Sequence, residues 1–268
     1  MGRVLVATAV SVERDAVAAA VGALPSGSDG EVLGVVGRAH PFRPSGATAH
    51  GGSGATAHGG SGATAHGGSS GRGIDVVVVG VGPGLAGAAT GSVLAAAALR
   101  GTPYDLVVSA GIGGGFLPEA RVGSLVVADE IVAADLGAET PDGFLSVTEL
   151  GFGTVRHQPP ADLVRLVCDA VGARSGAVLT VSTVTGTAER AAALRERHPT
   201  ALAEAMEGFG VAEAAALHGV PVLEVRAISN PVGPRDRAAW RIPDALAALT
   251  EGFGKLVPVL ESWNRHDQ

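Results

Sequence analysis

Three polar residues stand among apolar neighbours where one predicted element ends and the next begins. Glu13 opens a helix directly after the first strand, Glu207 opens another in Ala-Met-Glu-Gly-Phe-Gly, and Asn230 follows the last core strand. Each has an ordinary structural explanation, since an acid in a first helical turn favours the helix dipole and Ser-Asn-Pro commonly terminates a strand. Because all three fall at one expected edge of the sheet, two carboxylates and an amide together favour a ligand site there.

Two glycine-rich segments follow predicted strands. Gly80–Gly87 contains a G-x-G-x-x-G pattern. A dinucleotide site would also need an acid at the end of the next strand, whereas Asp105 stands at the start of its strand. We therefore favour a tight turn with close helix packing over a ligand-facing loop, and both over NAD binding. Gly111–Gly115 suits either a chain reversal or a backbone-lined pocket for an anion, a water or a sugar oxygen. Neither segment continues as a phosphate-binding Gly-Lys-Ser/Thr loop.

Strands and helices alternate along the chain. Runs of β-branched residues predict strands at 4–7, 75–79, 106–109, 124–128, 177–181 and 222–228. Periodic or alanine-rich stretches predict helices at 13–21, 85–99, 161–171, 189–197, 207–217 and 243–262. We therefore predict a three-layer α/β/α sandwich around a central mixed, mostly parallel sheet. The uncharged run at 76–99 is long enough to span a bilayer, but its glycine turn indicates a buried strand followed by a buried helix.

The sequence predicts one domain, residues 1–268, with a single insertion. Residues 45–71 contain Ser-Gly-Ala-Thr-Ala-His-Gly-Gly three times in tandem. Such a segment cannot bury enough surface to offset the entropy of ordering it, so we expect a disordered surface loop between strands at 31–36 and 74–79. The eight-residue spacing of its histidines presets no metal geometry, and we predict no metal site.

Composition argues against several classes of function. The 268 residues are 46% hydrophobic, 17% charged and 3% aromatic, with a net charge of −7. Nucleic-acid binding is disfavoured, because single strands need stacking rings and both forms need a basic surface. Cys168 lies in an amphipathic stretch, which favours core packing over a catalytic thiol. The first residues lack the architecture of a signal peptide, so we expect a cytoplasmic protein without a membrane partner.

Three segments carry a resemblance to a known family: 108–130, 205–212 and 226–230. Their motifs Ser-Ala-Gly-Ile-Gly-Gly-Gly-Phe-Leu-Pro, Ala-Met-Glu-Gly-Phe-Gly and Arg-Ala-Ile-Ser-Asn resemble the nucleoside phosphorylase and nucleosidase superfamily, and most nearly its methylthioadenosine/S-adenosylhomocysteine nucleosidases. Segments 8–15 and 228–240 narrow the resemblance to members that release hypoxanthine. The resemblance implies a nucleoside hydrolase that needs no metal or organic cofactor and forms a homodimer or a larger homo-oligomer.

The resemblance also implies roles for individual residues. Glu13 matches the family's water-activating carboxylate, which serves a reaction through an oxocarbenium-like sugar. Glu207 matches the residue that holds the ribose hydroxyls, with Met206 against the sugar face, although ordinary core packing also explains a methionine. Ile112 and Gly113 match the turn that lies near the nucleophile.

Asn230 departs from the adenine-releasing nucleosidases, which carry aspartate at this position. An amide does not titrate, so it cannot protonate the purine, but its NH₂ group can donate hydrogen bonds to N7 and O6 of a 6-oxopurine. A mismatch would leave buried groups unpaired at about 1–3 kcal/mol each, so Asn230 favours hypoxanthine over adenine. Ser229 is a neighbouring candidate. Glu189 is a candidate acceptor for purine N1–H, and an exposed helix-start carboxylate is an equal alternative.

Arg235, Asp236 and Arg237 form a charged segment after Asn230. These residues could cap the site and meet a carboxylate of the substrate, or they could form a solvated loop. Asp236 is also a candidate replacement for the missing acid.

Three alternatives to a hypoxanthine-releasing hydrolase stay open. An adenine-releasing nucleosidase would share the motifs. A phosphorylase would need cations around the nucleophile, where Arg14 is the obvious one. A non-catalytic purine-nucleoside binding protein is conceivable because of the asparagine, but the presence of both Glu13 and Glu207 argues against it.

Overall fold

The computed structural model describes residues 2–21 and 73–263. Its strands are β1 (Arg3–Thr8), β2 (Gly73–Val78), β3 (Leu106–Gly115), β4 (Leu125–Ala133), β5 (Gly137–Thr140), β6 (Gly143–Ser146), β7 (Arg156–His157), β8 (Arg174–Thr180), β9 (Ala201–Ala205) and β10 (Val222–Pro231). Its helices are α1 (Ser11–Val21), α2 (Pro83–Leu99), α3 (Ala161–Val171), α4 (Ala188–Arg197), α5 (Gly208–Leu217), the 3₁₀ helix η1 (Arg237–Ala239) and α6 (Ile242–Ser262).

The six predicted helices are confirmed, each within two residues at either end. The predicted strands within the described residues are also confirmed, but β5, β6, β7 and β9 were not predicted. The strand expected at 31–36 and the insertion at 45–71 lie outside the described residues.

Eight strands form one sheet with mixed pairing, as predicted. Parallel pairs join β1 to β2, β1 to β3, β3 to β10, β4 to β8 and β8 to β9, whereas β10–β4, β3–β9 and β4–β7 are antiparallel. Because β10 pairs with both β3 and β4, and β8 and β9 link β4 back to β3, five strands close into a ring. Three flat layers do not describe this centre, since the short strand β9 bridges β8 and β3.

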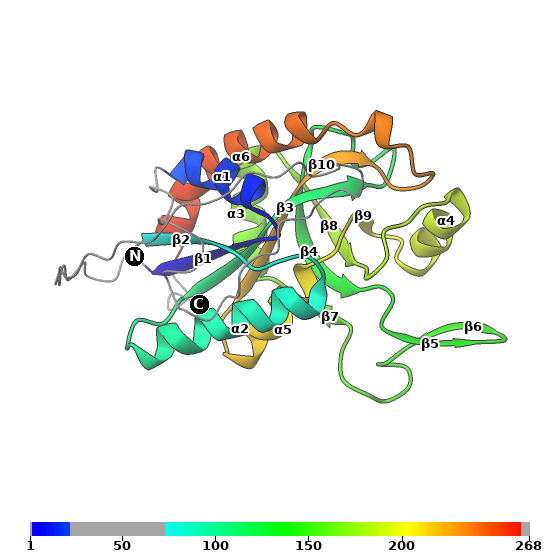
Figure 1. The fold of residues 1–268 in the computed structure, drawn as a ribbon, viewed down its shortest axis with the longest axis horizontal. Helices are drawn as coiled ribbons and strands as arrows, with labels where there is room; N and C mark the ends of the chain where they lie inside the picture. The colour runs from blue at the N-terminus through cyan, green and yellow to red at the C-terminus, as the bar shows by residue number, and fades with distance from the viewer. Residues whose placement is uncertain (1, 22–72, 264–268) are drawn as a thin grey trace, which may run out of the picture.

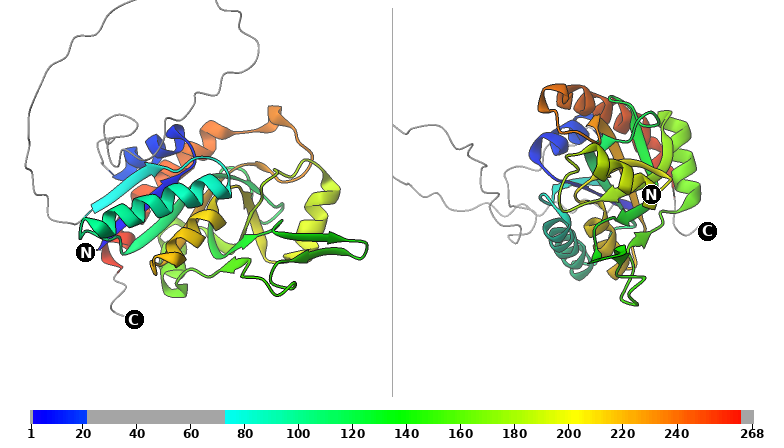
Figure 2. Two further views of the ribbon diagram at one scale, coloured as in Figure 1. Left: turned by 60° about the horizontal axis from the view of Figure 1, so that its bottom comes forward. Right: turned by 90° about the vertical axis from the view of Figure 1, so that its right-hand side faces the viewer.

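Helices cover the sheet in two groups (Figure 1, Figure 2). α2 and α5 pack against each other over a core cluster that includes Val93 and Val211. α1, α3 and α6 cover the other side over a second cluster, which includes Val17 and Phe253. α4 contributes Leu194 to a third, smaller cluster. Since β1, β3 and β10 run parallel, their carboxyl ends lie together at one edge of the sheet.

The first glycine-rich segment is a tight turn followed by a closely packed helix, as predicted. Gly80 and Gly82 have φ angles of 88° and 89°, which favour glycine, and Pro83 occupies the first turn of α2. A Cβ on Gly210 of α5 would lie only 2.0 Å from the carbonyl oxygen of Pro83. The run at 76–99 is therefore a strand, a turn and a helix. None of the helices in the described part of the chain is long and apolar enough to cross a membrane.

The second glycine-rich segment does not reverse the chain, so the first of the two alternatives given for it, and the expected turn at Ile112 and Gly113, were wrong. β3 continues through Gly115, so Ile112 and Gly113 lie in a strand. A Cβ at Gly113 would lie 2.9 Å from the backbone oxygen of Glu204, and one at Gly115 would lie 2.2 Å from that of Ala120. The glycines are needed because backbone approaches this strand closely, and the chain does not reverse there.

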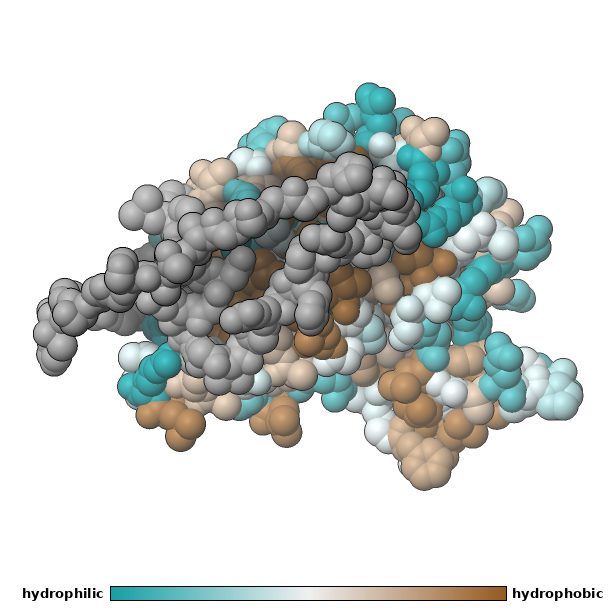
Figure 3. All heavy atoms as spheres, viewed as in Figure 1, coloured by the Kyte–Doolittle hydropathy of each residue, from teal (hydrophilic) through white to brown (hydrophobic). Residues whose placement is uncertain are grey.

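The β5–β6 hairpin projects from the body of the molecule (Figure 1). The hairpin and the segment that joins it to β7 carry apolar side chains on their surface: Phe152 is 70% exposed, and Leu145 and Leu150 are each 38% exposed. Figure 3 shows hydrophobic residues gathered at the lower right, where Figure 1 places these segments.

Candidate active site

Glu13 lies in the first turn of α1, and its carboxylate turns back onto the end of β1. The backbone N–H groups of Ala9 and Val10 donate to Oε2 over 2.9 and 3.2 Å, and that of Ile112 donates to Oε1 over 2.9 Å. A Cβ on Gly111 would lie 2.6 Å from Oε1, so a glycine there makes room for the carboxylate. Glu13 is thus held where β1 and β3 lie side by side.

Burial raises the pKa of Glu13 above its ordinary value. The Arg226 guanidinium and the backbone donor at Ile112 oppose the rise, whereas the Glu207 carboxylate adds to it. A buried carboxylate with a raised pKa is suited to accept a proton near neutral pH.

Glu207 immediately precedes α5 and is 7% exposed. Its Oε2 accepts a hydrogen bond from Nη1 of Arg226 over 3.2 Å, and its Oε1 lies 3.4 Å from the backbone nitrogen of Gly82. The carboxylate is therefore held between β10 and the glycine turn that begins α2.

Arg226 joins these groups, and sequence reasoning assigned it no role. Its Nε donates to Glu224 over 2.8 Å, its Nη2 to the hydroxyl of Ser109 over 3.0 Å, and its Nη1 also lies 3.4 Å from the carbonyl oxygen of Ile112. Burial opposes its charge, but Glu224, Glu207 and Glu13 raise the pKa of the guanidinium above its ordinary value. The alternation of Glu224 and Arg226 with apolar residues over positions 222–228 was the available signal.

Asn230 lies at the end of β10, opposite Gly114 of β3 and just after an irregularity in the pairing. Its Nδ2 donates to the carbonyl oxygen of Pro231 over 2.9 Å. The hydroxyl of Ser229 lies 2.8 Å from Oδ1 of Asn230 and 3.2 Å from the carbonyl oxygen of Gly113, and can donate to either. The amide is thus oriented, and Nδ2 retains a second hydrogen.

The structure thus brings Glu13, Ile112 and Glu207 together around Arg226 and places Gly113, Ser229 and Asn230 at the adjoining strand ends. Met206 is partly buried directly before Glu207. In this arrangement, one carboxylate can accept a hydrogen bond from water, a second can bind hydroxyl groups, and the amide can donate to a purine.

Three other predicted residues lie on the surface. Glu189 is exposed in the first turn of α4, where hydrogen bonds to its own backbone and to Thr187 lower its pKa. Asp236 is exposed, and its Oδ1 accepts from the backbone nitrogen of Ala238 over 3.0 Å at the start of η1. Arg235 is exposed, with its guanidinium carbon 5.7 Å from the centre of the Trp240 ring. Residues 235–237 are thus exposed, and Arg237 begins the 3₁₀ helix η1.

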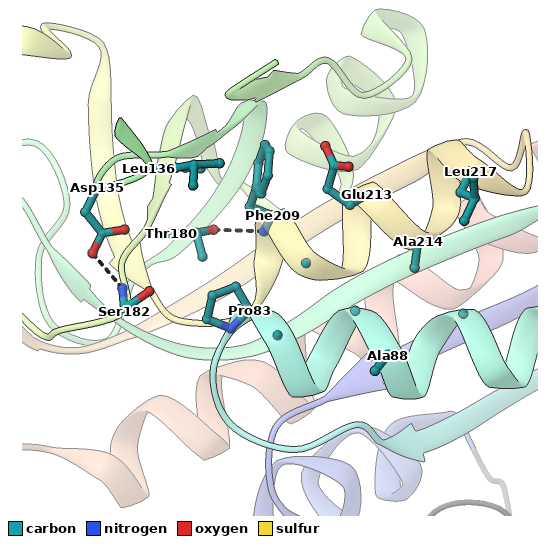
Figure 4. A pocket seen from close by; sticks show the side chains of 15 residues that line it. Pro83, Ala88, Asp135, Leu136, Thr180, Ser182, Phe209, Glu213, Ala214 and Leu217 are labelled. Atoms are coloured by element: carbon teal, nitrogen blue, oxygen red, sulfur yellow. Dashed lines mark hydrogen bonds between the residues drawn. The ribbon is translucent and has the colours of Figure 1, made fainter. Parts of the chain in front are cut away.

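A cavity of about 610 Å³ lies between α2 and α5, and its lining includes Phe209 and Gly210, which follow Glu207 in the chain (Figure 4). Phe209 and Thr180 face it and are joined by a 2.8 Å hydrogen bond, as are Ser182 and Asp135. None of the predicted site residues lines it.

Within the described ranges, no group of three or more histidine, cysteine, aspartate or glutamate residues is arranged to hold a metal ion. Cys168 lies in α3, is partly buried and packs against the core cluster that α1, α3 and α6 cover.

The chain matches one family profile, that of the phosphorylase superfamily, over residues 31–256. It is 63% identical to a futalosine hydrolase of Streptomyces coelicolor over an alignment of 264 residues, and this alignment covers 98% of this chain and 99% of that enzyme. Among solved structures, a 5′-methylthioadenosine/S-adenosylhomocysteine nucleosidase from Neisseria meningitidis aligns over 98% of this chain and 100% of its own, with a TM-score of 0.68 and 16% identity. The structure of futalosine hydrolase of Helicobacter pylori aligns over 96% of this chain and 97% of its own, with a TM-score of 0.66 and 16% identity. At such low identity, the two structures support the fold alone.

Proposed function

Since the chain belongs to the phosphorylase superfamily and, within it, to the futalosine hydrolases, we propose that it cleaves futalosine with water into hypoxanthine and dehypoxanthinyl futalosine. We also propose that this reaction belongs to menaquinone biosynthesis, which the resemblance of the motifs supports, and that it takes place in the cytoplasm. The observation that carries the catalytic assignment is the position of Ile112. Its N–H donates to Glu13, and its carbonyl oxygen faces the same Arg226 that holds Glu207.

In this proposal, Glu13 activates the water. The carboxylate accepts a proton as the water oxygen bonds to C1′ of the ribose, and its raised pKa favours that transfer. The three backbone N–H groups that hold Glu13 fix its direction, so little reorganisation accompanies the step.

Glu207 binds the ribose hydroxyls. The carboxylate forms an ion pair with Arg226, and each of its oxygens has a second lone pair for a hydroxyl hydrogen. The same negative charge stabilises the oxocarbenium-like sugar as the N-glycosyl bond breaks, with Met206 against the sugar face. Ser229 orients the amide of Asn230 from the adjoining position.

Asn230 stabilises the leaving base without transferring a proton to it. The electron pair of the broken C1′–N9 bond moves into the purine, and the second hydrogen of the Asn230 NH₂ group, which Pro231 does not use, is shared between N7 and O6. Asp236 caps η1 at the surface, so its position does not support the role of replacement acid. The exposed Arg235 remains a candidate partner for the carboxylate at the benzoate end of the substrate.

Water is favoured over phosphate as the nucleophile because of how the nearby cations are paired. Arg226 donates to two carboxylates, a hydroxyl and a carbonyl oxygen, and Arg14 forms an ion pair with Asp15. Both cations therefore already have protein partners, which disfavours phosphate.

We also propose that the chain acts as a homodimer or a larger homo-oligomer, in keeping with its family and with the exposed apolar surface around Phe152.

The experiment is base release from futalosine, aminodeoxyfutalosine, methylthioadenosine and inosine, each with and without phosphate, with products identified by mass. We expect hypoxanthine from futalosine at a rate that phosphate does not change. Dependence on phosphate would establish a phosphorylase, preferred release of adenine would establish an adenine nucleosidase, and no release from any substrate would support a binding protein.

A further inference from the structure

Glu224 is a buried acid to which the proposed mechanism assigns no role. Its side chain is fully buried in β10, and the register pairs it with Ser109 of β3, two positions before the pair of Arg226 and Gly111. Side chains two residues apart in a strand point to the same face of the sheet, so Glu224 and Arg226 lie side by side. Burying a carboxylate costs free energy unless it is paired and hydrogen-bonded, so its contacts need an explanation.

Glu224 fixes the orientation of Arg226. Nε of Arg226 donates to Oε1 of Glu224 over 2.8 Å, and Nη2 donates to the hydroxyl of Ser109 over 3.0 Å. Because the guanidinium is planar and rigid, these two bonds determine where its third nitrogen lies. That nitrogen, Nη1, faces Glu207 over 3.2 Å and the carbonyl oxygen of Ile112 over 3.4 Å.

The surroundings of Glu224 favour its charged form. Burial raises its pKa and the Glu207 carboxylate adds to the rise, whereas Arg226 opposes it. Oε2 is buried without a hydrogen-bond partner among the described residues, so a carboxylic acid would leave an unsatisfied O–H there. Both oxygens lie against Gly208, the first residue of α5, since a Cβ on this glycine would be 2.2 Å from Oε2 and 2.3 Å from Oε1. The positive end of the helix dipole therefore favours the carboxylate as Arg226 does.

The charge of Arg226 also bears on Glu13. A Cβ at Gly111 would lie 2.9 Å from Nη1 of Arg226 and 2.6 Å from Oε1 of Glu13, so these two atoms are at most about 5.5 Å apart, the sum of the two distances. At that range, a guanidinium without other partners would strongly favour the charged form of Glu13 and make it a poorer base. A carboxylate bonded to the far side of Arg226 reduces this effect.

Few other charges act on Glu13. Arg226 and Glu207 are the charged groups with the largest influence on it, and β3 carries no charged residue. Charged residues on β1, β2 and α6, which also pack against α1, form ion pairs or are exposed: Arg3 with Asp75, Asp244 with Arg241, Glu251 with Lys255, and the exposed Glu261.

We propose that Glu224 is a positioning residue for the hydrolysis, which holds Arg226 through Nε and balances its charge, so that Nη1 orients Glu207 while Glu13 can still accept a proton from water. This inference rests on the proposed function. Glu224 acts through Arg226 and does not contact the substrate.

The test compares the pH dependence of kcat/KM for futalosine in wild type, Glu224→Gln and Glu224→Asp. Glutamine keeps an acceptor for Nε but removes the charge, so the acid limb assigned to Glu13 should move to lower pH by about one unit. Aspartate keeps the charge, so its acid limb should stay at the wild-type pH. The matched control is Glu130→Gln, which removes a strand carboxylate that accepts from Arg156 over 2.7 Å and should leave the limb in place. An acid limb that does not move in Glu224→Gln, or that moves equally in either of the other variants, would overturn the inference.

A second measurement covers the case in which Glu224→Gln does not fold. Aspartate is one methylene shorter, so its carboxylate draws back from Nε and Arg226 orients Glu207 less well. KM for futalosine should therefore rise about tenfold in Glu224→Asp, with a smaller change in kcat. A KM equal to that of wild type would remove the positioning role. If wild type releases no hypoxanthine from futalosine, the proposed function fails. If wild type releases it and neither variant changes the acid limb or KM, the inference about Glu224 fails alone.

Discussion

The backbone N–H of Ile112 donates a 2.9 Å hydrogen bond to Oε1 of Glu13, a residue 99 positions earlier in the chain. The bond ties the start of α1 to the middle of β3, and the carbonyl oxygen of Ile112 lies 3.4 Å from Nη1 of Arg226. The backbone of one residue thus connects the Glu13 carboxylate, to which we assign water activation, to the ion pair that holds Glu207. The following predictions test this arrangement.

The first prediction concerns pH. Burial raises the pKa of Glu13 above its ordinary value of 4.5. As the pH falls, the Glu13 carboxylate should therefore become protonated at a higher pH than an exposed glutamate does. A protonated Glu13 cannot accept a proton from water, so kcat/KM for futalosine should decline on the acid side. Glu13→Gln should lower kcat about 100-fold or more and remove this acid limb, whereas the exposed control Asp15→Asn should retain it. An acid limb that persists in Glu13→Gln would contradict the assignment.

The second prediction concerns the buried charges. Arg226→Met leaves Glu207 and Glu224 without their cation, and breaking a buried ion pair costs about 3–5 kcal/mol. The free energy of unfolding in urea should fall by that amount. The double variant Arg226→Met/Glu224→Gln should recover part of the loss, because it removes one uncompensated charge. A single variant as stable as wild type would show that Arg226 does not offset these carboxylates.

The third prediction concerns the glycines of β3. A Cβ at Gly111 would lie 2.6 Å from Oε1 of Glu13 and 2.9 Å from Nη1 of Arg226. Gly111→Ala should therefore destabilise the protein by about 1–3 kcal/mol and lower kcat, because both charged groups must move. The control is Gly84→Ala in α2, where the added Cβ meets no atom of the described residues within 4 Å. Equal activity and stability in the two variants would refute this account of the segment.

The fourth prediction concerns Asn230. An aspartate at this position can accept from a 6-amino group and protonate N7, whereas the amide donates to O6 and N7. Asn230→Asp should shift the ratio of kcat/KM values away from futalosine and towards aminodeoxyfutalosine by about tenfold or more. The ratio is measured with both substrates in one competition assay. An undiminished preference for the 6-oxopurine would remove Asn230 from base selection.

Local signals in the sequence predicted much of this molecule. α3 begins and ends where its apolar periodicity does, and the glycine-proline turn before α2 was predicted from residue types that favour such a turn. Glu13, Glu207 and Asn230 were predicted at one edge because parallel strands end together, and Ile112 links Glu13 to the Arg226 that holds Glu207.

Features set by distant parts of the chain were harder to predict. The composition of Gly111–Gly115 is also typical of a turn. Only the structure shows that Glu13, Arg226 and Glu204 lie too close to this segment for side chains at Gly111 and Gly113. β9 has five residues, too few to display a period, yet it closes the ring of strands. Charged residues alternating with apolar ones in β10 were a usable signal, because a buried charge in a strand requires a partner.

The most direct test of the central claim is to run the reaction in ¹⁸O-labelled water without phosphate and to follow both products by mass spectrometry. We predict that dehypoxanthinyl futalosine gains one ¹⁸O at C1′, that hypoxanthine remains unlabelled, and that Glu13→Gln slows the incorporation as much as it slows base release. Release of hypoxanthine without the label in the sugar product, or release only when phosphate is added, would contradict the account.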